Sequence, residues 1–533
     1  MSVSEPRVDN PPAPGRRAAA LALAGIVVLL ALPVRLYLAG SAAMLSRDGV
    51  TFIRCARAME HEPLAVMRSQ PQHPLYPAAI LAAHATMRSL GPAVSAVLHD
   101  PIRGWTLAAV LVALAGGLAV VVGVYLVTAG LFGPPAGLAA AAMTALAAEF
   151  CRISADGLSD MPHLALYLAA LAAVLRGLRQ WRTGWFLLGG LLSGMAFLCR
   201  PEGAEVAMVA AAALLVFPRN RLRRQRWKAA AAVALGALLI ASPYMAITGK
   251  VVQKKSPWKL LLPSAGQAPP APSLQAAAEA PVRAGVDGRG LLSVGEALKI
   301  IGEKWGRALR VTLLLPALWW LFGGRPAGDA PGVRLVGALM LVHLLILIGL
   351  ILRMDYADLL SLRHVLVLAG LTMPFAGAGV IQAGQRLHAR RPGVAAAVLI
   401  GLLIAPTLPW LVAVPYADDV YLRRAGEWIR RHSAGPTPRV MAERHRVAFY
   451  ADGEPIVFQE SRTAGEVLEL ARRTRPEWLV LDERRTLRSH PGFLDELARS
   501  LSPGETLELV HTEAGGGRRT ASRALIYRYA AGP

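Results

Sequence analysis

Long apolar runs dominate this sequence and limit what it can fold into. A helix needs about 20 mostly apolar residues to cross the hydrocarbon core of a bilayer. Roughly eleven runs near that length lie between charged or Pro/Gly breaks. They lie near residues 18–42, 104–130, 134–150, 161–176, 184–199, 203–217, 229–247, 309–323, 334–352, 364–382 and 393–414. The chain is therefore expected to be a mainly α-helical, polytopic membrane bundle.

Composition supports this expectation. Of the 533 residues, 54% are hydrophobic and 17% charged, too few charges for the surface of a soluble chain of this length. A cytosolic enzyme, a disulfide-rich secreted domain and a disordered chain are therefore excluded. Cys55, Cys151 and Cys199 lack the number and spacing of a disulfide framework or a zinc site. The sequence names no cofactor and leaves a divalent cation open.

The basic residues follow the loops in a regular pattern. The net charge is +22, which alone would also suit a nucleic-acid partner. With residues 1–17 as a cytoplasmic tail, however, the arginine-rich segments all fall on the inner side, as the positive-inside rule describes. These segments contain Arg7, Arg16 and Arg17; Arg176, Arg179 and Arg182; residues 219–228; and Arg386, Arg390 and Arg391. The sequence thus predicts a multi-pass membrane protein with a cytoplasmic N-terminus and without a nucleic-acid partner.

The same topology assigns the remaining segments to the outer face. We expect a transmembrane module over residues 18–414, with large outer loops at 43–103 and 248–308 and shorter ones at 151–160 and 353–363. The tail from residue 415 to 533 alternates strand-like runs, near 439–441, 456–458, 478–481 and 525–527, with amphipathic stretches near 464–472 and 493–500. This alternation predicts a small extracytoplasmic α/β domain. We expect this domain to have a role in structural support or recognition and not in the chemical reaction.

Three acids lie at the expected outer edge of the bundle, where charge near hydrocarbon is costly and usually functional. Asp48 follows the first span, and its alternative interpretation is a solvated loop acid. Asp156 and Asp160 lie between the third and fourth runs. Asp160 precedes Met161 and Pro162, so a helix cap is an equally good interpretation of it.

Two further segments belong to the first outer loop. Residues 51–59 are apolar on one side and basic on the other, which is typical of a helix at the membrane interface. Residues 70–77 then read Gln-Pro-Gln-His-Pro-Leu-Tyr-Pro. A rigid turn explains the prolines, but it does not explain His73 and Tyr76 between them, which we take as candidate substrate-binding residues.

An acid after the first span, an interfacial helix, a Pro-Leu-Tyr element and a second acid between the third and fourth runs follow one another along the chain. This order resembles that of the GT-C glycosyltransferase superfamily, specifically the bacterial relatives of protein O-mannosyltransferases and the aminoarabinose transferase of lipid A. Residues 190–203, Gly-Leu-Leu-Ser-Gly-Met-Ala-Phe-Leu-Cys-Arg-Pro-Glu-Gly, are similar to a signature of that family. Residues 361–368, Ser-Leu-Arg-His-Val-Leu-Val-Leu, resemble its Arg-Tyr-Leu entry to a late span.

The resemblance implies transfer of a sugar from a polyprenyl-phosphate donor to a lipid, glycan or protein acceptor on the outer face of the inner membrane. It assigns the catalytic base to Asp48 and the second acid to Asp160, with Asp156 as its competitor. The family pattern is Asp-Glu where this chain has Asp48-Gly49. Where aminoarabinose transferases carry Glu-Lys-Pro-Pro-Leu, this chain reads Gln-His-Pro-Leu over residues 72–75.

A departing polyprenyl phosphate requires fixed cationic donors, and the planar guanidinium of arginine suits phosphate oxygens. Arg200, Arg363 and His364 are the leading candidates for phosphate binding, and Arg200 and Arg363 have the alternative of extending from span ends to lipid headgroups. Further outer-side candidates are Arg353, Lys254 and Lys255.

Two competing functions remain open at this level. A transporter or flippase of an amphipathic lipid-linked substrate would show paired halves and ionisable residues at mid-membrane, and neither is visible. A non-catalytic membrane anchor would leave the outer acids without a role. His343, inside the ninth run, is expected to be hydrogen-bonded within the bundle and not to bind a metal.

Overall fold

The fold is described from a computed structural model of the chain. The structure describes residues 15–90, 100–216, 221–251, 293–323, 329–354, 360–458, 462–515 and 522–531. Helices account for most of these residues, and a small sheet lies near the C-terminus. The predicted fold class, a helical membrane bundle followed by a small α/β unit, is therefore confirmed.

Seven helical segments within the described ranges are long and apolar enough to cross a membrane, and a bent pair of helices brings the number to eight. Four of the seven are single helices: α7 (Pro101–Phe132), α10 (Asp160–Gln180), α13 (Arg223–Thr248) and α18 (Ala330–Met354). The first span, Arg17–Ser41, is formed by α1 (Arg16–Gly25), the π-helical turn η1 (Ile26–Ala31) and α2 (Leu32–Ser41). The last two are η3 (Leu362–Val365) with α19 (Leu366–Leu387), and α20 (Pro392–Ile404) with η4 (Ala405–Thr407) and α21 (Leu408–Leu411). The pair is α8 (Pro134–Ala145) and α9 (Ala148–Ser154), bent by 62°.

The other three apolar runs of the sequence are also helical, but they form shorter elements. They are α11 (Thr183–Cys199), α12 (Ala204–Val216) and α17 (Leu315–Phe322). All three pack within the bundle, α11 between α10 and α13, α12 against α13, and α17 against α19. All eleven predicted runs therefore contain helix, although not every one is long enough to span a membrane alone.

Glycines allow the close approach of α11 and α13. A Cβ atom at Gly194 would lie 2.8 Å from the carbonyl oxygen of Ala237, and one at Gly190 would collide with the carbonyl group of Val233. Small residues at such positions let two membrane helices pack backbone against backbone. The spacing of these two glycines places both on the face of α11 that contacts α13.

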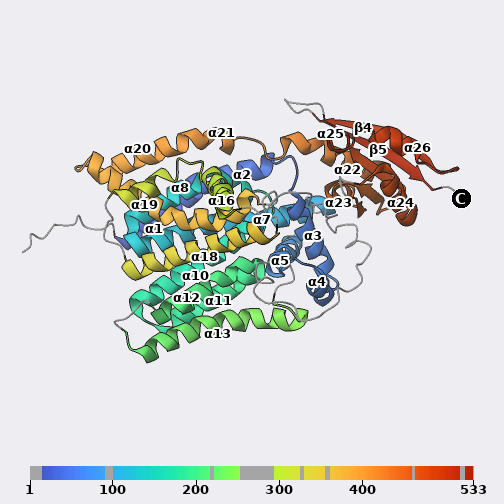
Figure 1. Cartoon of the computed structure of the whole chain (residues 1–533). Coiled ribbons are helices and arrows are strands. Elements are labelled where there is room, and N and C mark those ends of the chain that lie inside the picture. The colour runs from blue at the N-terminus through green and yellow to red at the C-terminus, as the bar shows by residue number, and fades with distance from the viewer. Residues whose placement is uncertain are drawn as a thin grey trace, which may run out of the picture.

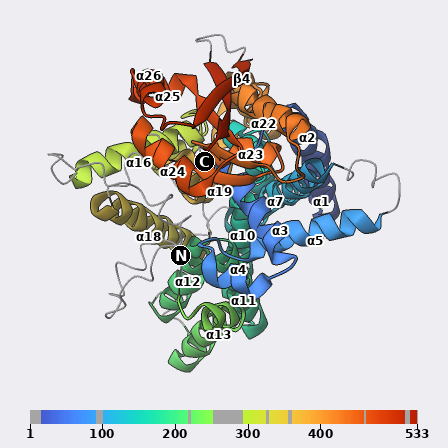
Figure 2. The ribbon, with the colours of Figure 1, turned by 90° about the vertical axis from the view of Figure 1, so that its right-hand side faces the viewer.

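Several short helical elements lie between the candidate spans in sequence and gather toward the end of the bundle that carries the C-terminal unit. They are α3 (Arg47–Met59), α4 (Pro63–Ser69), α5 (Leu75–Ser89), α16 (Val294–Ala308) and the turn η2 (Pro201–Gly203). Figure 1 shows α3, α4 and α5 between the long helices and the C-terminal unit. Figure 2 looks onto that end of the molecule and shows the same helices beside α23 of the C-terminal unit.

The C-terminal unit is a five-stranded sheet with helices around it. Its order is β2-β1-β3-β5-β4, in which β1 is parallel to both β2 and β3, whereas β5 is antiparallel to β3 and β4. The strands are β1 (Arg439–Ala442), β2 (Glu454–Val457), β3 (Trp478–Asp482), β4 (Thr506–Gly515) and β5 (Ser522–Ala530), and the helical elements are η5 (Ala417–Asp419), α22 (Val420–His432), α23 (His445–Tyr450), α24 (Ala464–Thr474), α25 (Glu483–Ser489) and α26 (Phe493–Arg499).

Sequence pattern predicted four of the five strands and missed β4. The central strand β3 is buried at all five positions, so its apolar run is continuous. In β4, exposed and half-buried residues are mixed along an edge strand, and its sequence lacks a strong apolar run. No residue of β4 is fully buried, so the strand leaves a weak apolar signal in the sequence.

The C-terminal unit binds directly to the start of α3. His445 Nε2 donates to the carbonyl oxygen of Arg47 at 3.0 Å, and the Leu45 N–H donates to the hydroxyl of Tyr450 at 2.9 Å. Farther along α3, Arg57 forms an ion pair with Asp452 at 2.9 Å. The last hundred residues of the chain therefore hold a helix that begins at residue 47.

Candidate functional site

Helix α3 presents Asp48 in its first turn. Its N-cap is Ser46, whose hydroxyl accepts from the Gly49 N–H at 3.1 Å. A Cβ atom at Gly49 would lie 2.9 Å from the carbonyl oxygen of Asp156, so a larger residue there would force this backbone apart. This contact explains why glycine follows Asp48 where the family pattern has a second acid. Half of the Asp48 side chain is exposed.

Asp48 is the first member of a row of alternating charges. Arg363 Nη1 donates to Asp48 Oδ2 at 2.5 Å, and Arg363 Nη2 lies 2.8 Å from Asp160 Oδ2. The second oxygen of Asp160 accepts from Arg200 Nη1 at 2.7 Å. Arg200 in turn lies 3.4 Å from Glu202. Five side chains from four separate segments thus form one connected network, which we call the charge row: Asp48, Arg363, Asp160, Arg200 and Glu202.

Burial increases toward the middle of the charge row. The Asp160 side chain is 3% exposed, whereas that of Arg363 is 22% exposed. A carboxylate this deeply buried requires paired cations, because an unpaired charge in an apolar interior is strongly disfavoured. At the end of the row, Arg200 holds the pKa of Glu202 well below its usual range, against the opposing effect of burial. Glu202 is therefore an ionised partner of Arg200, and Asp160 is the buried acceptor shared by both arginines.

The backbone around Asp160 fixes its position. The N-cap of α10 is Ser159, which makes no side-chain cap, and the carboxylate of Asp160 binds the two arginines instead. A Cβ atom at Gly116 of α7 would lie 2.5 Å from the backbone nitrogen of Pro162. The helix start is thus pressed against α7, and the interpretation of Asp160 as a helix cap is replaced by that of a shared ligand for Arg200 and Arg363.

Asp156 lies beside the charge row and binds a different set of partners. Its Oδ1 accepts from the Ser46 N–H at 2.8 Å, and its Oδ2 accepts from the hydroxyl of Tyr416 at 2.7 Å. Burial raises its pKa to about 6, although both hydrogen bonds act in the opposite direction. Asp156 therefore ties the loop before Asp48 to the segment that enters the C-terminal unit.

Comparisons with known proteins identify the fold on which this site is built. Residues 93–247 match the family model described as dolichyl-phosphate-mannose-protein mannosyltransferase. ArnT from Cupriavidus metallidurans in its apo state superposes with a TM-score of 0.57 at 14% identity, over 97% of this chain and 100% of that one. The chain has the GT-C fold.

Other solved structures agree with this assignment. The GT-C match includes ArnT bound to undecaprenyl phosphate, with a TM-score of 0.57 at 14% identity over 96% of this chain and 98% of that one. It also includes the oligosaccharyltransferase AglB from Archaeoglobus fulgidus, in complex with an inhibitory peptide and a dolichol-phosphate. For AglB the TM-score is 0.57 at 12% identity, over 91% of this chain and 72% of that one. Comparison with curated proteins gives no match.

The GT-C fold confirms the resemblance read from the sequence motifs. The family model agrees with the predicted class of enzyme, a glycosyltransferase, and the apolar helices agree with an integral membrane protein. The fold also brings together four of the eight predicted site residues, Asp48, Asp160, Arg200 and Arg363.

The remaining predicted residues lie around the charge row in different environments. His364 Nδ1 accepts from the Ser361 N–H at 3.1 Å, and His364 lines a narrow polar cavity of ≈10 Å³ together with Asp160, Arg200 and Arg363. Tyr76 is fully buried and donates to the carbonyl oxygen of Ala109 at 3.1 Å. His73 is buried among the rings of Phe197 and Tyr244, at 5.0 and 5.4 Å between centroids.

Three further candidates fall outside the side chains that the structure describes. Lys254 and Lys255 lie outside the described residues, and the side chain of Arg353 does as well. His343 is hydrogen-bonded inside the bundle as expected, with Nδ1 3.0 Å from the carboxylate of Glu205 and Nε2 3.1 Å from the carbonyl oxygen of His364. Among the described residues, no group of three or more His, Cys, Asp or Glu side chains is arranged to hold a metal ion.

Sequence reasoning missed several residues of the site. Glu202 was visible in the Arg-Pro-Glu-Gly motif, directly beside a predicted phosphate ligand, but was not selected. Tyr416 and His445 carry no local signal, because each acts on Asp156 or Arg47 from more than 250 residues away. These contacts can be identified only from the three-dimensional structure.

Proposed function

We propose that this protein transfers a sugar from a polyprenyl-phosphate donor to an acceptor at the outer face of the bacterial inner membrane. The charge row is the observation that carries the proposal. It joins an exposed carboxylate, a suitable general base, to two guanidinium groups, suitable ligands for phosphate, at one end of a membrane bundle. The bound undecaprenyl phosphate of ArnT and dolichol-phosphate of AglB support a lipid-phosphate donor.

Donor binding is proposed to begin at Arg363. Its guanidinium bridges Asp48 and Asp160. A donor phosphate competes with Asp48 for Nη1, since both are anionic acceptors, while the buried Asp160 keeps the other edge of the guanidinium in place. Binding of the phosphate thereby releases the carboxylate of Asp48 toward the acceptor.

Asp48 then serves as the general base. It takes the proton of the acceptor hydroxyl as that oxygen forms a bond to the sugar carbon and the bond from that carbon to the phosphate oxygen breaks. The polyprenyl phosphate leaves with the bonding electron pair, and Arg363 and Arg200 stabilise its added charge.

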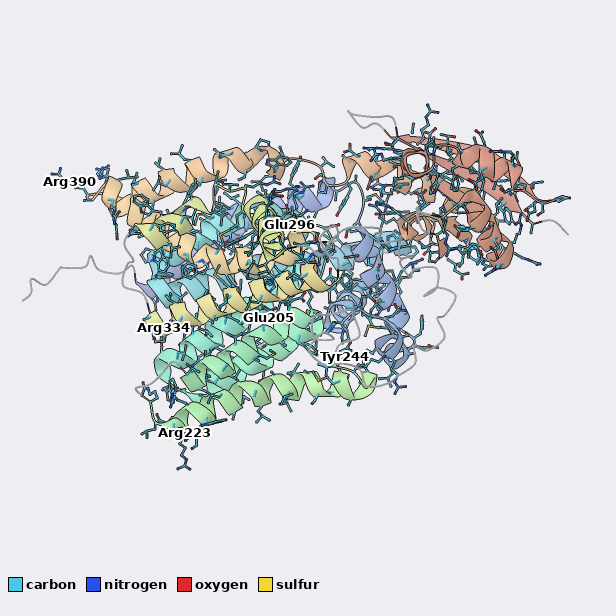
Figure 3. All side chains as sticks on the ribbon, viewed as in Figure 1. Glu205, Arg223, Tyr244, Glu296, Arg334 and Arg390 are labelled. Carbon is cyan, nitrogen blue, oxygen red and sulfur yellow. The ribbon has the colours of Figure 1, made fainter. Side chains whose placement is uncertain are left out.

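The orientation in the membrane is part of the proposal. Figure 3 shows Arg223, Arg334 and Arg390 at the end of the bundle opposite the C-terminal unit. Arginines concentrate on the cytoplasmic side of membrane proteins. This supports a cytoplasmic N-terminus, an outer position for Asp48 and an extracytoplasmic C-terminal unit.

The test is sugar transfer by purified protein supplied with a panel of polyprenyl-phosphate sugars, with loss of the sugar from the carrier as the readout. Asp48→Asn is expected to abolish the loss while expression and thermal stability stay near the wild-type level. Asp418→Asn, at an exposed aspartate near the same face, is the matched control and is expected to keep activity. Wild-type activity in Asp48→Asn would refute the assignment of the base.

A further inference from the structure

A second polar cavity lies where the bundle meets the C-terminal unit. Its volume is ≈350 Å³, far larger than the cavity beside His364. Its walls come from the end of α2, the start of α7, the loop before α3 and the helix α22. In Figure 1 these elements meet at the end of the bundle that carries the C-terminal unit.

One side of this junction cavity is cationic. Arg423, Arg430 and Arg431 line it from α22, and Arg103 lines it from α7. The opposite face of α22 is buried, so the helix turns its charged face to the cavity. Two carboxylates share the lining: Asp100 forms an ion pair with Arg430 at 2.9 Å, and Glu427 lies 3.4 Å from Arg423. Four arginines against two carboxylates leave the lining with an excess of positive charge.

The other side of the junction cavity is apolar. Ala39 near the end of the first span, and Ile102 and Val110 in the first turns of α7, form part of its lining. Both helices are candidate membrane spans. A cavity with apolar residues of two candidate membrane spans on one side and guanidinium groups on the other matches an amphiphile with an anionic headgroup.

Two polar atoms of the lining lack a hydrogen-bond partner among the described residues. The hydroxyl of Thr106 is buried without one, and so is Nε of Arg423, which lies 3.4 Å from Glu427 Oε1 in a poor hydrogen-bond geometry. Buried polar groups are normally satisfied, so such a pair at one cavity points to a polar ligand. A phosphate group, with several acceptor oxygens, would accept from both.

We propose that the junction cavity binds the phosphate headgroup of a membrane amphiphile, at a site separate from the charge row. The two sites are adjacent, because residues next to each other in the sequence contribute to each. Leu45 and Ala155 line the junction cavity, and the residues that follow them, Ser46 and Asp156, are hydrogen-bonded to each other beside Asp48. The binding does not depend on sugar transfer, because the headgroup meets α22 rather than Arg363.

The test measures binding to purified, delipidated full-length protein without donor. The probes are short-chain phosphatidic acid, short-chain phosphatidylcholine and inorganic phosphate. We expect phosphatidic acid to bind tightest. Arg423→Gln with Arg431→Gln should weaken it by about tenfold for each charged hydrogen bond lost. Arg390→Gln with Arg391→Gln, an exposed arginine pair on the inner-end loop after α19, is the matched control and should change nothing.

Each other outcome would overturn the proposal. Equal binding of phosphatidylcholine would remove the role of the cationic wall, and equal binding of inorganic phosphate would remove the role of the apolar wall. Unchanged binding in the Arg423 and Arg431 variant would place the lipid elsewhere. Asp48→Asn is expected to keep full lipid binding, so failure of the proposed transferase mechanism and failure of this site are distinguishable.

Discussion

Asp48 and Arg363 are separated by 315 positions in the sequence, yet their side chains form an ion pair of 2.5 Å. One partner is at the start of the interfacial helix α3 and the other in the turn η3 that leads into α19. The pair has a direct consequence for catalysis: the proposed base is occupied by a cation until another anion takes its place.

Substitution of Arg363 should therefore affect the donor before the acceptor. Arg363→Lys keeps a positive charge but cannot bridge Asp48 and Asp160 with a planar fork. We expect the KM for the polyprenyl-phosphate sugar to rise and kcat to fall by about 10²-fold or more, as when a donor to a developing anion is removed. Steady-state kinetics with each substrate varied in turn checks this. An equal rise in the KM of the acceptor would contradict a phosphate role.

Two glycines of α7 offer a matched test of how the site is positioned. Gly116→Ala places a Cβ atom 2.5 Å from the backbone of Pro162, so the start of α10 and with it Asp160 must move. A displacement near 1 Å in such a site costs about 10²-fold in rate. Gly130→Ala in the same helix meets nothing within 4 Å and should leave activity unchanged. Comparable activity of the two variants would show that the α7–α10 contact does not set the site.

Asp156 predicts a pH dependence of stability with a defined sign. Its pKa is about 6 in the folded chain against 3.8 ordinarily, so the folded state binds the proton more tightly. Its contribution to stability is complete below pH 4 and is lost as the pH rises through 6, a change of about 3 kcal/mol at most.

The check for Asp156 is the difference in melting temperature between the wild type and Asp156→Asn. Because asparagine does not ionise, the wild type should lose stability relative to the variant between pH 4 and 7. Comparing the two proteins cancels the contribution of other titrating groups, including His445, whose pKa burial lowers to about 4. A difference that stays constant across this range would refute the raised pKa.

Membrane orientation can be checked by cysteine labelling. The native residues Cys55, Cys151 and Cys199 are all buried, so background labelling should be low. In intact cells, a membrane-impermeant maleimide is expected to modify Asp418→Cys but not Arg390→Cys. Permeabilised cells should show labelling of both. The reverse pattern would place Asp48 in the cytoplasm and remove the proposed mechanism.

Sequence alone predicted much of this architecture, and the reasons are physical. Apolar runs near the thickness of a bilayer predict helices, since backbone groups in lipid must satisfy one another. They do not predict that α11, α12 and α17 are shorter than a full span, because a buried short helix is as apolar as a spanning one. Arg200 and Arg363 were predicted as phosphate ligands on the outer side, with extension from span ends to lipid headgroups as the alternative, and in the structure both bind Asp160.

The contacts that sequence could not predict are those made across the chain. The local sequence around Asp160 does not indicate that its carboxylate is shared by two arginines, because a helix-capping aspartate has the same local sequence. Likewise, the interpretation of residues 70–77 as a turn was sound for the prolines, but Tyr76 is satisfied by the backbone of Ala109, a partner that only packing against α7 supplies.

The hydrogen bonds between α23 and the residues at the start of α3 also bear on when, during synthesis, the candidate site can be completed. Residues 45 and 47 leave the ribosome early, but their partners Tyr450 and His445 are synthesised some four hundred positions later. A growing chain therefore carries an unfinished centre through most of its insertion. With the proposed function and orientation, activity is expected only after the last segment has crossed the bilayer and packed against the segment around residues 45–47.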